Sequence, residues 1–461
     1  MNDIFIYLKS ILPELQNLTN NEIEDYVIRV VLSSPYCRAT EQQIYDIVQK
    51  NYYPGLFNMS ERIKNPAFLL EETMVSFEDW LCIKIKAEIE QIYKSENLVV
   101  RIDAVGIETI VRYCVCILYF KNQKNICFLD LIINQEYSDI FRRILMLLIT
   151  GNVFYVFNNN LNFNKSGKKI VPQIIQKTNH YSLHERLLQS IASGMIGMDI
   201  KEKNISTAPI SLESNLKLEE KDIGSIINAL DAYIHNNSKI GIDCFENYYN
   251  EVLLGCNLNI VWFTDDYIET IFEMKFIEEQ MRFNKTLNFT IVPRYDSYSN
   301  DASYEDVIDM LELDELRELK QYYKIGRFNI CRNGMDISTI DFFRMSSELY
   351  DIILKSNICV ISGARAFEMT QGMKKVVYYT GIAVCKSYTE SITGFSRNSG
   401  KLVFLRQDVG EHSFEGFKDR AWRKIQDDDK IIPAAKITAK EYYMEKCNDK
   451  KTSQRQYSCY N

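Results

Sequence analysis

Two short apolar runs that each end at acidic side chains constrain this chain most. The first spans residues 260–263 and is followed at once by Asp265 and Asp266; the second spans residues 289–293, with Asp301 a short loop later. Short continuous apolar runs are typical of strands that are buried on both faces of a parallel sheet. Such sheets bind ligands beyond the carboxyl ends of their strands. The pattern therefore predicts that the three carboxylates gather at one edge of a sheet.

The whole C-terminal half alternates between strand-like and helix-like segments. Strands are expected at 258–263, 287–293, 327–331, 357–361, 375–380 and 402–406. Helices are expected at 182–198, 223–235, 268–284, 303–312, 339–355 and 364–372. Alternation of this kind is typical of strands that lie parallel with helices on both faces of the sheet. We therefore predict an α/β fold, a three-layer α/β/α arrangement with a mainly parallel, Rossmann-like sheet.

The N-terminal part of the chain does not show this strand–helix alternation, so we expect separate structural units there. Residues 1–96 are predicted to form a helical region, and residues 97–175 a small α+β accessory unit. The stretch 158–169 is rich in Asn, Lys and Gly, which predicts a surface loop or linker. A metal-dependent α/β domain would then span residues 176–430, followed by a polar tail at 431–461.

Composition and missing motifs narrow the classes of function. The net charge of −8 leaves no basic excess to neutralise phosphates, so we expect no nucleic-acid partner. The longest apolar run, residues 144–157, is too short to span a bilayer, and the start of the chain lacks the pattern of a signal peptide. We therefore expect a cytoplasmic protein without a membrane partner. The absence of Gly-x-Gly-x-x-Gly, Walker and Gly-x-Ser-x-Gly motifs lowers the expectation of dinucleotide, nucleotide triphosphate and serine-hydrolase chemistry.

Two interpretations compete for the acidic residues after the first strand. Carboxylate oxygens are the ligands that hard divalent cations such as Mg²⁺ and Mn²⁺ prefer. Asp is also a good helix N-cap, and Glu269 three residues after Asp266 resembles a capping box. Asp301 favours the metal site, because capping does not need it. His180 and His184 are four residues apart and give a weak zinc signal, while His412 is expected in a loop.

Four short blocks in the C-terminal half share their order and spacing with one known family. They are residues 265–269 (Asp-Asp-Tyr-Ile-Glu), 300–306 (Asn-Asp-Ala-Ser-Tyr-Glu-Asp), 333–337 (Asn-Gly-Met-Asp-Ile) and 360–368 (Val-Ile-Ser-Gly-Ala-Arg-Ala-Phe-Glu). The blocks resemble the motifs Asp-Asn-Ala-Gly-Glu, Asn-Asp-Ala-Thr-x-x-Asp, Pro-Gly-x-Asp-Leu and a Lys-Gly pair with a downstream Glu. These motifs are those of the damage-control phosphatase family, also described as the acidic-residue methyltransferase-like domain.

The resemblance covers about residues 180–406 and implies a metal-dependent phosphatase of small phosphorylated metabolites, such as sugar phosphates or damaged phospho-metabolites. In the family, the Asp-Asn pair and the later Asp coordinate the metal. Residue by residue, these positions carry over to Asp265, Asp266 and Asp301. The implied cofactor is a divalent metal, namely Mn, Co, Ni or Mg. Asp265 and Asp301 are also the expected catalytic residues.

Two departures from the family pattern affect the expected phosphate site. Asp266 stands where the family has Asn, and its extra charge should tighten metal binding and weaken phosphate binding. Ser362 stands where the family has a phosphate-contacting Lys, so Arg365 is expected to supply the missing cation as a third catalytic residue. An exposed helical Arg and a plain turn Asn remain the alternatives for Arg365 and Asn300. The expected substrate-binding residues are Asn300, Ser362, Gly363, Arg365 and Lys386.

Three hypotheses of function follow from these residues. The first is a metal-dependent hydrolase of small phosphorylated metabolites. The second is a diverged family member that keeps the fold and the metal but acts on another small polar substrate, or binds without turnover. The third is a non-enzymatic interaction protein whose N-terminal part makes the recognition. The sequence does not determine the substrate, the identity of the metal or the oligomeric state.

Overall fold

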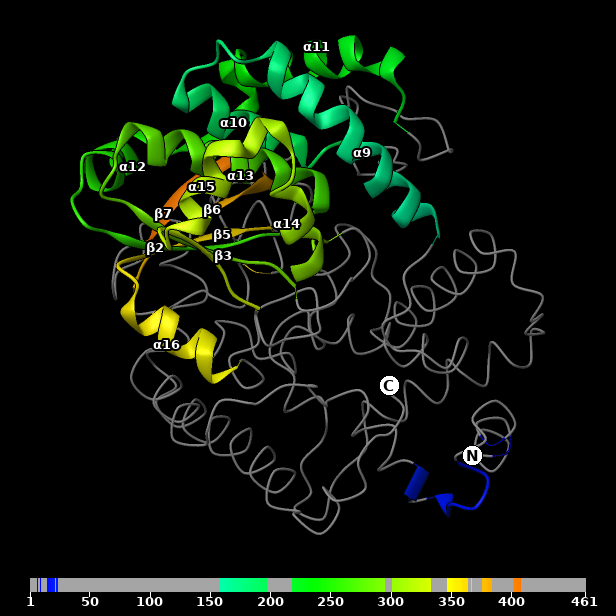
Figure 1. Ribbon diagram of the computed structural model, residues 1–461. Coiled ribbons are helices and arrows are strands. Elements are labelled where there is room, and N and C mark those ends of the chain that lie inside the picture. Colours follow the sequence, from blue (N-terminus) through cyan, green and yellow to red (C-terminus); the bar gives the residue numbers. More distant parts are fainter. Residues whose placement is uncertain are drawn as a thin grey trace, which may run out of the picture.

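The computed structural model describes most of the C-terminal two thirds of the chain, shown as coloured ribbon in Figure 1. The described ranges are 158–196, 218–294, 301–332, 346–363, 375–383 and 401–407, together with Ala366 and a few residues near the N-terminus (Ile6, Lys9, 15–20 and 22–23). The expected helical N-terminal region, most of the accessory unit and the polar tail lie outside these residues. The structural statements below concern the described residues.

The core of the fold is one seven-stranded sheet. Its strands are β1 (Ile240–Asp243), β2 (Asn259–Phe263), β3 (Asn288–Val292), β4 (Phe328–Ile330), β5 (Ile358–Ser362), β6 (Val376–Ala383) and β7 (Lys401–Gln407). They lie in the order β1-β7-β6-β5-β2-β3-β4. The strands from β6 to β4 in this order pair in parallel, whereas β7 pairs antiparallel with β6 and parallel with β1. The predicted α/β fold with a mainly parallel sheet is confirmed.

Helices cover both faces of this sheet. They are α9 (Asn158–Lys177), α10 (Leu183–Ser193), α11 (Ile223–Ile234), α12 (Phe245–Tyr248), α13 (Tyr267–Phe283), α14 (Tyr304–Met310), α15 (Arg317–Lys324) and α16 (Ser347–Lys355). Figure 1 shows α16 on the opposite side of the sheet from α10 and α13. Every residue of β5, and β2 from Ile260 onward, is buried, as strands between two helical layers must be.

Helix α13 connects β2 to β3 and carries much of the core. It packs against α9, α10 and α15, so it is enclosed between the sheet and an outer layer of helices. Its buried residues therefore lie all around the helix, and they include the acidic side chains Glu269, Glu273 and Glu278. A buried carboxylate is costly unless it has a partner or takes up a proton. The acidic residues nearest the start of α13 lie beside the candidate site described below.

The expected surface loop at 158–169 is wrong, because these residues form the first part of α9. Phe163, Ile170, Val171 and Ile174 follow helical spacing and belong to the same hydrophobic core as α13. The polar Asn and Lys residues between them occupy the outer face, which made the segment look like a linker. The expected domain division at residue 175 consequently falls inside a helix that packs on the α/β domain.

All six expected strands are present, with ends that differ from the predicted ones by at most three residues. The sequence analysis missed β1, α12 and α15, and it did not predict that β7 runs against its neighbour β6. Residues 339–345 and nearly all of 364–372 lie outside the described part. Among the described helices, none has the length and apolar character needed to cross a membrane.

Candidate metal centre

The candidate site lies where the strand order of the sheet reverses. From β2 the chain continues outward to β3 and β4, and then returns to form β5 on the other side of β2. The connections that follow β2 and β5 therefore lead to opposite sides of the sheet, and this reversal point is the usual ligand position in open α/β sheets. Asp265 and Asp266 follow β2 at this point, and Gly363 follows β5.

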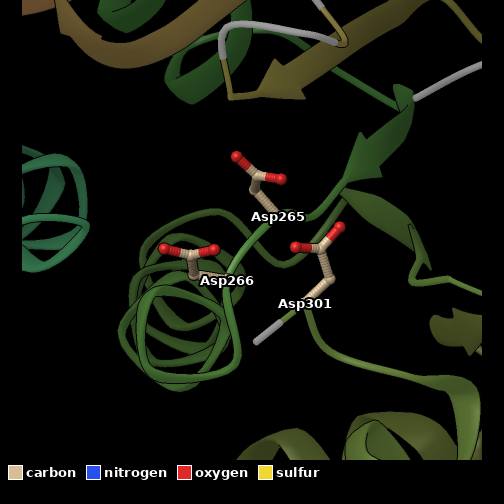
Figure 2. A group of neighbouring side chains, drawn as sticks. All are labelled: Asp265, Asp266 and Asp301. Atoms are coloured by element: carbon tan, nitrogen blue, oxygen red, sulfur yellow. The ribbon is translucent and has the colours of Figure 1, made fainter. Parts of the chain in front are cut away.

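Asp265, Asp266 and Asp301 come together at this reversal point. One carboxylate oxygen of each lies within 4.8 Å of the others. Figure 2 shows the three side chains around a shared space, two from the segment that leads into α13 and one from the neighbouring segment. Asp301 is buried, and the other two are partly buried. Three converging carboxylates suit a hard divalent cation, whereas Zn²⁺ in structural sites prefers Cys and His. The donor set therefore fits the implied metal.

Backbone contacts hold the two acidic segments together. Asp266 and Asp301 form an antiparallel bridge. The amide of Ala302 donates to the carbonyl of Asp265 at 2.9 Å, and the amide of Arg294 donates to the carbonyl of Ala302 at 3.0 Å. The two segments that carry the aspartates are thus held together by main-chain hydrogen bonds, which do not depend on a bound ion.

Asp266 does not act as the helix cap that its position suggested. It is the N-cap residue of α13, but its side chain makes no capping hydrogen bond, and the capping box expected with Glu269 is absent. The next helix shows the contrast, because Ser303 accepts from the amide of Asp306 and Asp306 accepts from that of Ser303. The capping interpretation of Asp266 is therefore wrong, and its carboxylate belongs to the acidic cluster.

Gly363, which follows β5, lies directly against one member of the acidic cluster. Its φ angle is +90°, a backbone conformation that residues other than glycine rarely adopt. A Cβ atom built on Gly363 would lie 2.0 Å from Oδ2 of Asp265, closer than any non-bonded contact allows. The carboxylate of Asp265 therefore packs directly on the backbone of residue 363. This close approach gives Gly363, an expected substrate-binding residue, a defined part in positioning Asp265.

Arg294 was missed by the sequence analysis, although it contacts two members of the cluster. It follows β3, is 1% exposed, and donates from Nε to Asp301 Oδ2 at 2.8 Å and from Nη2 to Asp265 Oδ1 at 3.1 Å. An arginine directly after a buried strand was the available signal, because such a residue needs a buried acidic partner.

Two buried glutamates lie behind the cluster on α13. Glu273 accepts hydrogen bonds from Nε1 of Trp262, at 2.9 Å, and from the hydroxyl of Ser362. Burial raises the pKa of Glu273 to about 7, although these two hydrogen bonds oppose the shift. Burial, together with the charges of Glu273 and of the three aspartates, raises the pKa of Glu269 well above its usual range. Both side chains therefore keep their protons to higher pH than an ordinary glutamate does.

This shift predicts a pH-dependent stability. Because the folded-state pKa of Glu273 lies above its usual value of 4.5, the native protein binds more protons than the unfolded chain between about pH 4.5 and 7. The free energy of unfolding should fall as pH rises through this window. Glu273→Gln removes the titrating group, so it should be more stabilising, relative to wild type, at pH 8 than at pH 5, by on the order of a few kcal/mol.

Urea unfolding at the two pH values, in the presence of a chelator, measures this difference. Glu246→Gln is the matched control, because Glu246 is exposed on α12. It should show the same offset from wild type at both pH values. An offset for Glu273→Gln that does not change with pH would contradict the assignment of a raised pKa.

Some of the other expected residues lie within the described part of the chain, and the rest lie outside it. Ser362 is fully buried, and its hydroxyl also accepts from Oγ1 of Thr380 at 2.8 Å, so this side chain faces the core instead of a substrate. His180 lies before α10 begins, whereas His184, on α10, contacts Asp243 at 2.8 Å, so the two histidines do not lie on one helix. Three expected site residues, Asn300, Arg365 and Lys386, lie outside the described part of the chain, as does His412, which was expected in a loop.

Comparison with known proteins bears on the fold. No protein-family model matches this chain, and no curated protein sequence matches it. Among solved structures, it is similar to a DUF89 family protein from Pyrococcus horikoshii, with a TM-score of 0.51 and 16% sequence identity over 71% of this chain and 96% of that one. DUF89 is the family known as the damage-control phosphatases. The chain therefore shares its fold with a solved member of the family that its sequence motifs resemble.

Proposed function

We propose that this protein is a metal-dependent, phosphatase-like hydrolase that acts on small phosphorylated metabolites. The observation that carries the proposal is the convergence of Asp265, Asp266 and Asp301 at the reversal point of the sheet. The fold shared with a DUF89 protein supports it. In the sequence resemblance, the metal-binding positions of the damage-control phosphatases fall on these three residues, with Asp266 in place of the family's Asn.

In this proposal the three aspartates hold one divalent cation, and Mn, Co, Ni and Mg are the candidate metals. Such a cation supplies polarisation of a phosphoryl oxygen. The chain contributes the position of that cation and the polar groups around it. The side chain of Asp266 leaves the amides of the first turn of α13 uncapped. Helix N-termini attract anions, so this turn is a suitable place for the phosphate.

Arg294 cannot take the role of the phosphate-binding cation, because it is buried and contacts two carboxylates. We propose Arg365 for that role, with Lys386 as the second candidate and Asn300 and Gly363 at the edge of the substrate site. A planar guanidinium can bind two phosphate oxygens at once.

A diverged activity is the second candidate function, and Ser362 favours it. This residue stands where the family has its phosphate-contacting Lys, yet its hydroxyl is directed to Glu273 and Thr380 in the core. The position thus offers neither a cation nor an exposed polar group to a substrate. A member of this kind would keep the metal and act on another small polar substrate, or bind it without turnover.

Hydrolysis of a panel of sugar phosphates and phosphorylated cofactors tests the two candidates. The full chain is first treated with a chelator and then assayed with Mn²⁺, Co²⁺, Ni²⁺ or Mg²⁺. The proposal predicts turnover of at least one phosphomonoester that requires added metal and is lost with the chelator. Metal binding without hydrolysis of any phosphoester would favour the diverged function, and turnover unaffected by the chelator would contradict a metal-dependent reaction.

A further inference from the structure

The guanidinium of Arg294 lies between Asp265 and Asp301 and is more buried than either. Its side chain is 1% exposed, against 27% for Asp265 and 7% for Asp301. Its two contacts come from different nitrogens, Nε to Asp301 at 2.8 Å and Nη2 to Asp265 at 3.1 Å. The fork of one arginine therefore joins carboxylates that come from different segments of the chain.

The charges of the site show why such a contact is needed. Three carboxylates whose oxygens lie within 4.8 Å of each other repel strongly where the protein shields them from water. Their field already contributes to the raised pKa of the neighbouring Glu269. A permanently charged guanidinium offsets one of the three negative charges. The remainder is two negative charges, which a single divalent cation neutralises.

The backbone of Arg294 also places Asp301. Residues 294 and 303 form a parallel bridge, the amide of Tyr304 donates to the carbonyl of Arg294 at 2.9 Å, and the amide of Arg294 donates to Ala302. Arg294 thus holds the Asp301 segment through its main chain and the Asp301 carboxylate through its side chain. The side chain donates to Oδ2 of Asp301 and to Oδ1 of Asp265, so one guanidinium fixes both carboxylates.

We propose that Arg294 is a positioning residue that serves as the internal counter-cation of the metal site. It keeps Asp265 and Asp301 in their ligand arrangement when no metal is bound, and a divalent cation takes over most of this stabilisation on binding. The second half of this inference, in which a bound cation takes over the stabilisation, rests on the proposed metal site. Its first half concerns the metal-free protein alone.

The metal-free half predicts a rescue by removal of the carboxylate charges. Arg294→Met, measured with a chelator, should lower the Tm of the full chain by about 10 °C, because it leaves buried carboxylates without their counter-charge. Adding Asp265→Asn and Asp301→Asn to the same chain should restore most of that loss. If the combined variant stays as unstable as Arg294→Met, or if Arg294→Met does not fold and the combined variant does not fold either, Arg294 acts by packing and the proposal is overturned.

The second half predicts a larger metal effect in the variant than in wild type. Saturating Mn²⁺ should raise the Tm of Arg294→Met several degrees more than that of wild type, because the ion replaces the lost charge. The control is Arg327→Met: Arg327 donates to the carbonyl of Leu287 and stacks on Tyr322, and its loss should leave the Mn²⁺ increment unchanged. If Mn²⁺ raised the Tm of wild type and of Arg294→Met by the same amount, the proposal that the cation takes over the stabilisation by Arg294 would be overturned.

The two halves separate this inference from the proposed function. If Mn²⁺ changed the Tm of neither wild type nor Arg294→Met, the metal site would be contradicted. The proposal that a cation takes over the stabilisation by Arg294 would then fail with it. The chelator experiment would still decide whether Arg294 neutralises the carboxylates.

Discussion

Gly363→Ala is expected to weaken divalent-cation binding at the aspartate cluster. Its Cβ would lie 2.0 Å from Oδ2 and 2.5 Å from Cγ of Asp265, so the carboxylate has to leave its position. Backbone relaxation is limited, because the amide of Gly363 is held by the carbonyl of Thr380 at 3.0 Å. A displaced ligand should cost at least the roughly 10- to 100-fold in metal affinity that is typical of lost outer-shell partners. Calorimetric titration with Mn²⁺ measures the change.

Gly326→Ala separates this steric effect from backbone strain. Gly326 also has a positive φ angle, +76°, but a Cβ built there would meet nothing within 4 Å. Both variants carry the strain of an L-residue in this conformation, about 1 kcal/mol. Only Gly363→Ala should lose Mn²⁺ affinity. Equal affinities in the two variants would show that the contact of Gly363 with Asp265 does not position a ligand.

Asp265→Asn is expected to weaken metal binding without lowering the stability of the metal-free protein. The substitution removes one of three clustered charges that raise the pKa of Glu269, yet an amide oxygen can still accept from Nη2 of Arg294. The metal-free Tm should therefore be unchanged or higher than that of wild type. Mn²⁺ affinity should fall by about 100-fold or more, and any metal-dependent hydrolysis should fall with it. Such a gain in stability with a loss of activity is typical of functional sites.

Thermal unfolding with chelator and with Mn²⁺ measures both effects in one protein. Asp351→Asn is the matched control, because Asp351 is exposed on α16. It should keep both the metal-free Tm and the Mn²⁺ shift of wild type. A strongly reduced metal-free Tm in Asp265→Asn, together with an unchanged Mn²⁺ shift, would mean that Asp265 is a structural residue and not a ligand.

Local patterns were sufficient to predict the parallel part of the sheet. The apolar runs of β2 and β5 are short and uninterrupted because helices cover both of their faces. The convergence of Asp265, Asp266 and Asp301 was predictable for the same reason, since neighbouring parallel strands end at one edge. The direction of β7 was not, because strand direction depends on the preceding connection and on pairing with β6.

The contacts that complete the site depend on tertiary structure, which no local pattern contains. Gly363 approaches Asp265 across the gap between two strands that are almost 100 residues apart in the chain. Arg294 becomes a partner of Asp301 only because residues 294 and 303 pair. The first part of α9, residues 158–169, was mistaken for a linker because it is rich in Asn, Lys and Gly, and most of the apolar residues that α9 buries lie later in the helix. The acidic cluster was thus predictable from the sequence, whereas the contacts that hold it together were not.

The most direct test of the account is the position of a bound metal in crystals of the full chain grown or soaked with Mn²⁺. Anomalous scattering at the manganese edge locates the ion without reference to the protein density. The account predicts one strong peak that lies roughly 2.0–2.6 Å from carboxylate oxygens of Asp265, Asp266 and Asp301. A peak bound only by other residues, or no peak at the cluster at saturating Mn²⁺, would contradict it.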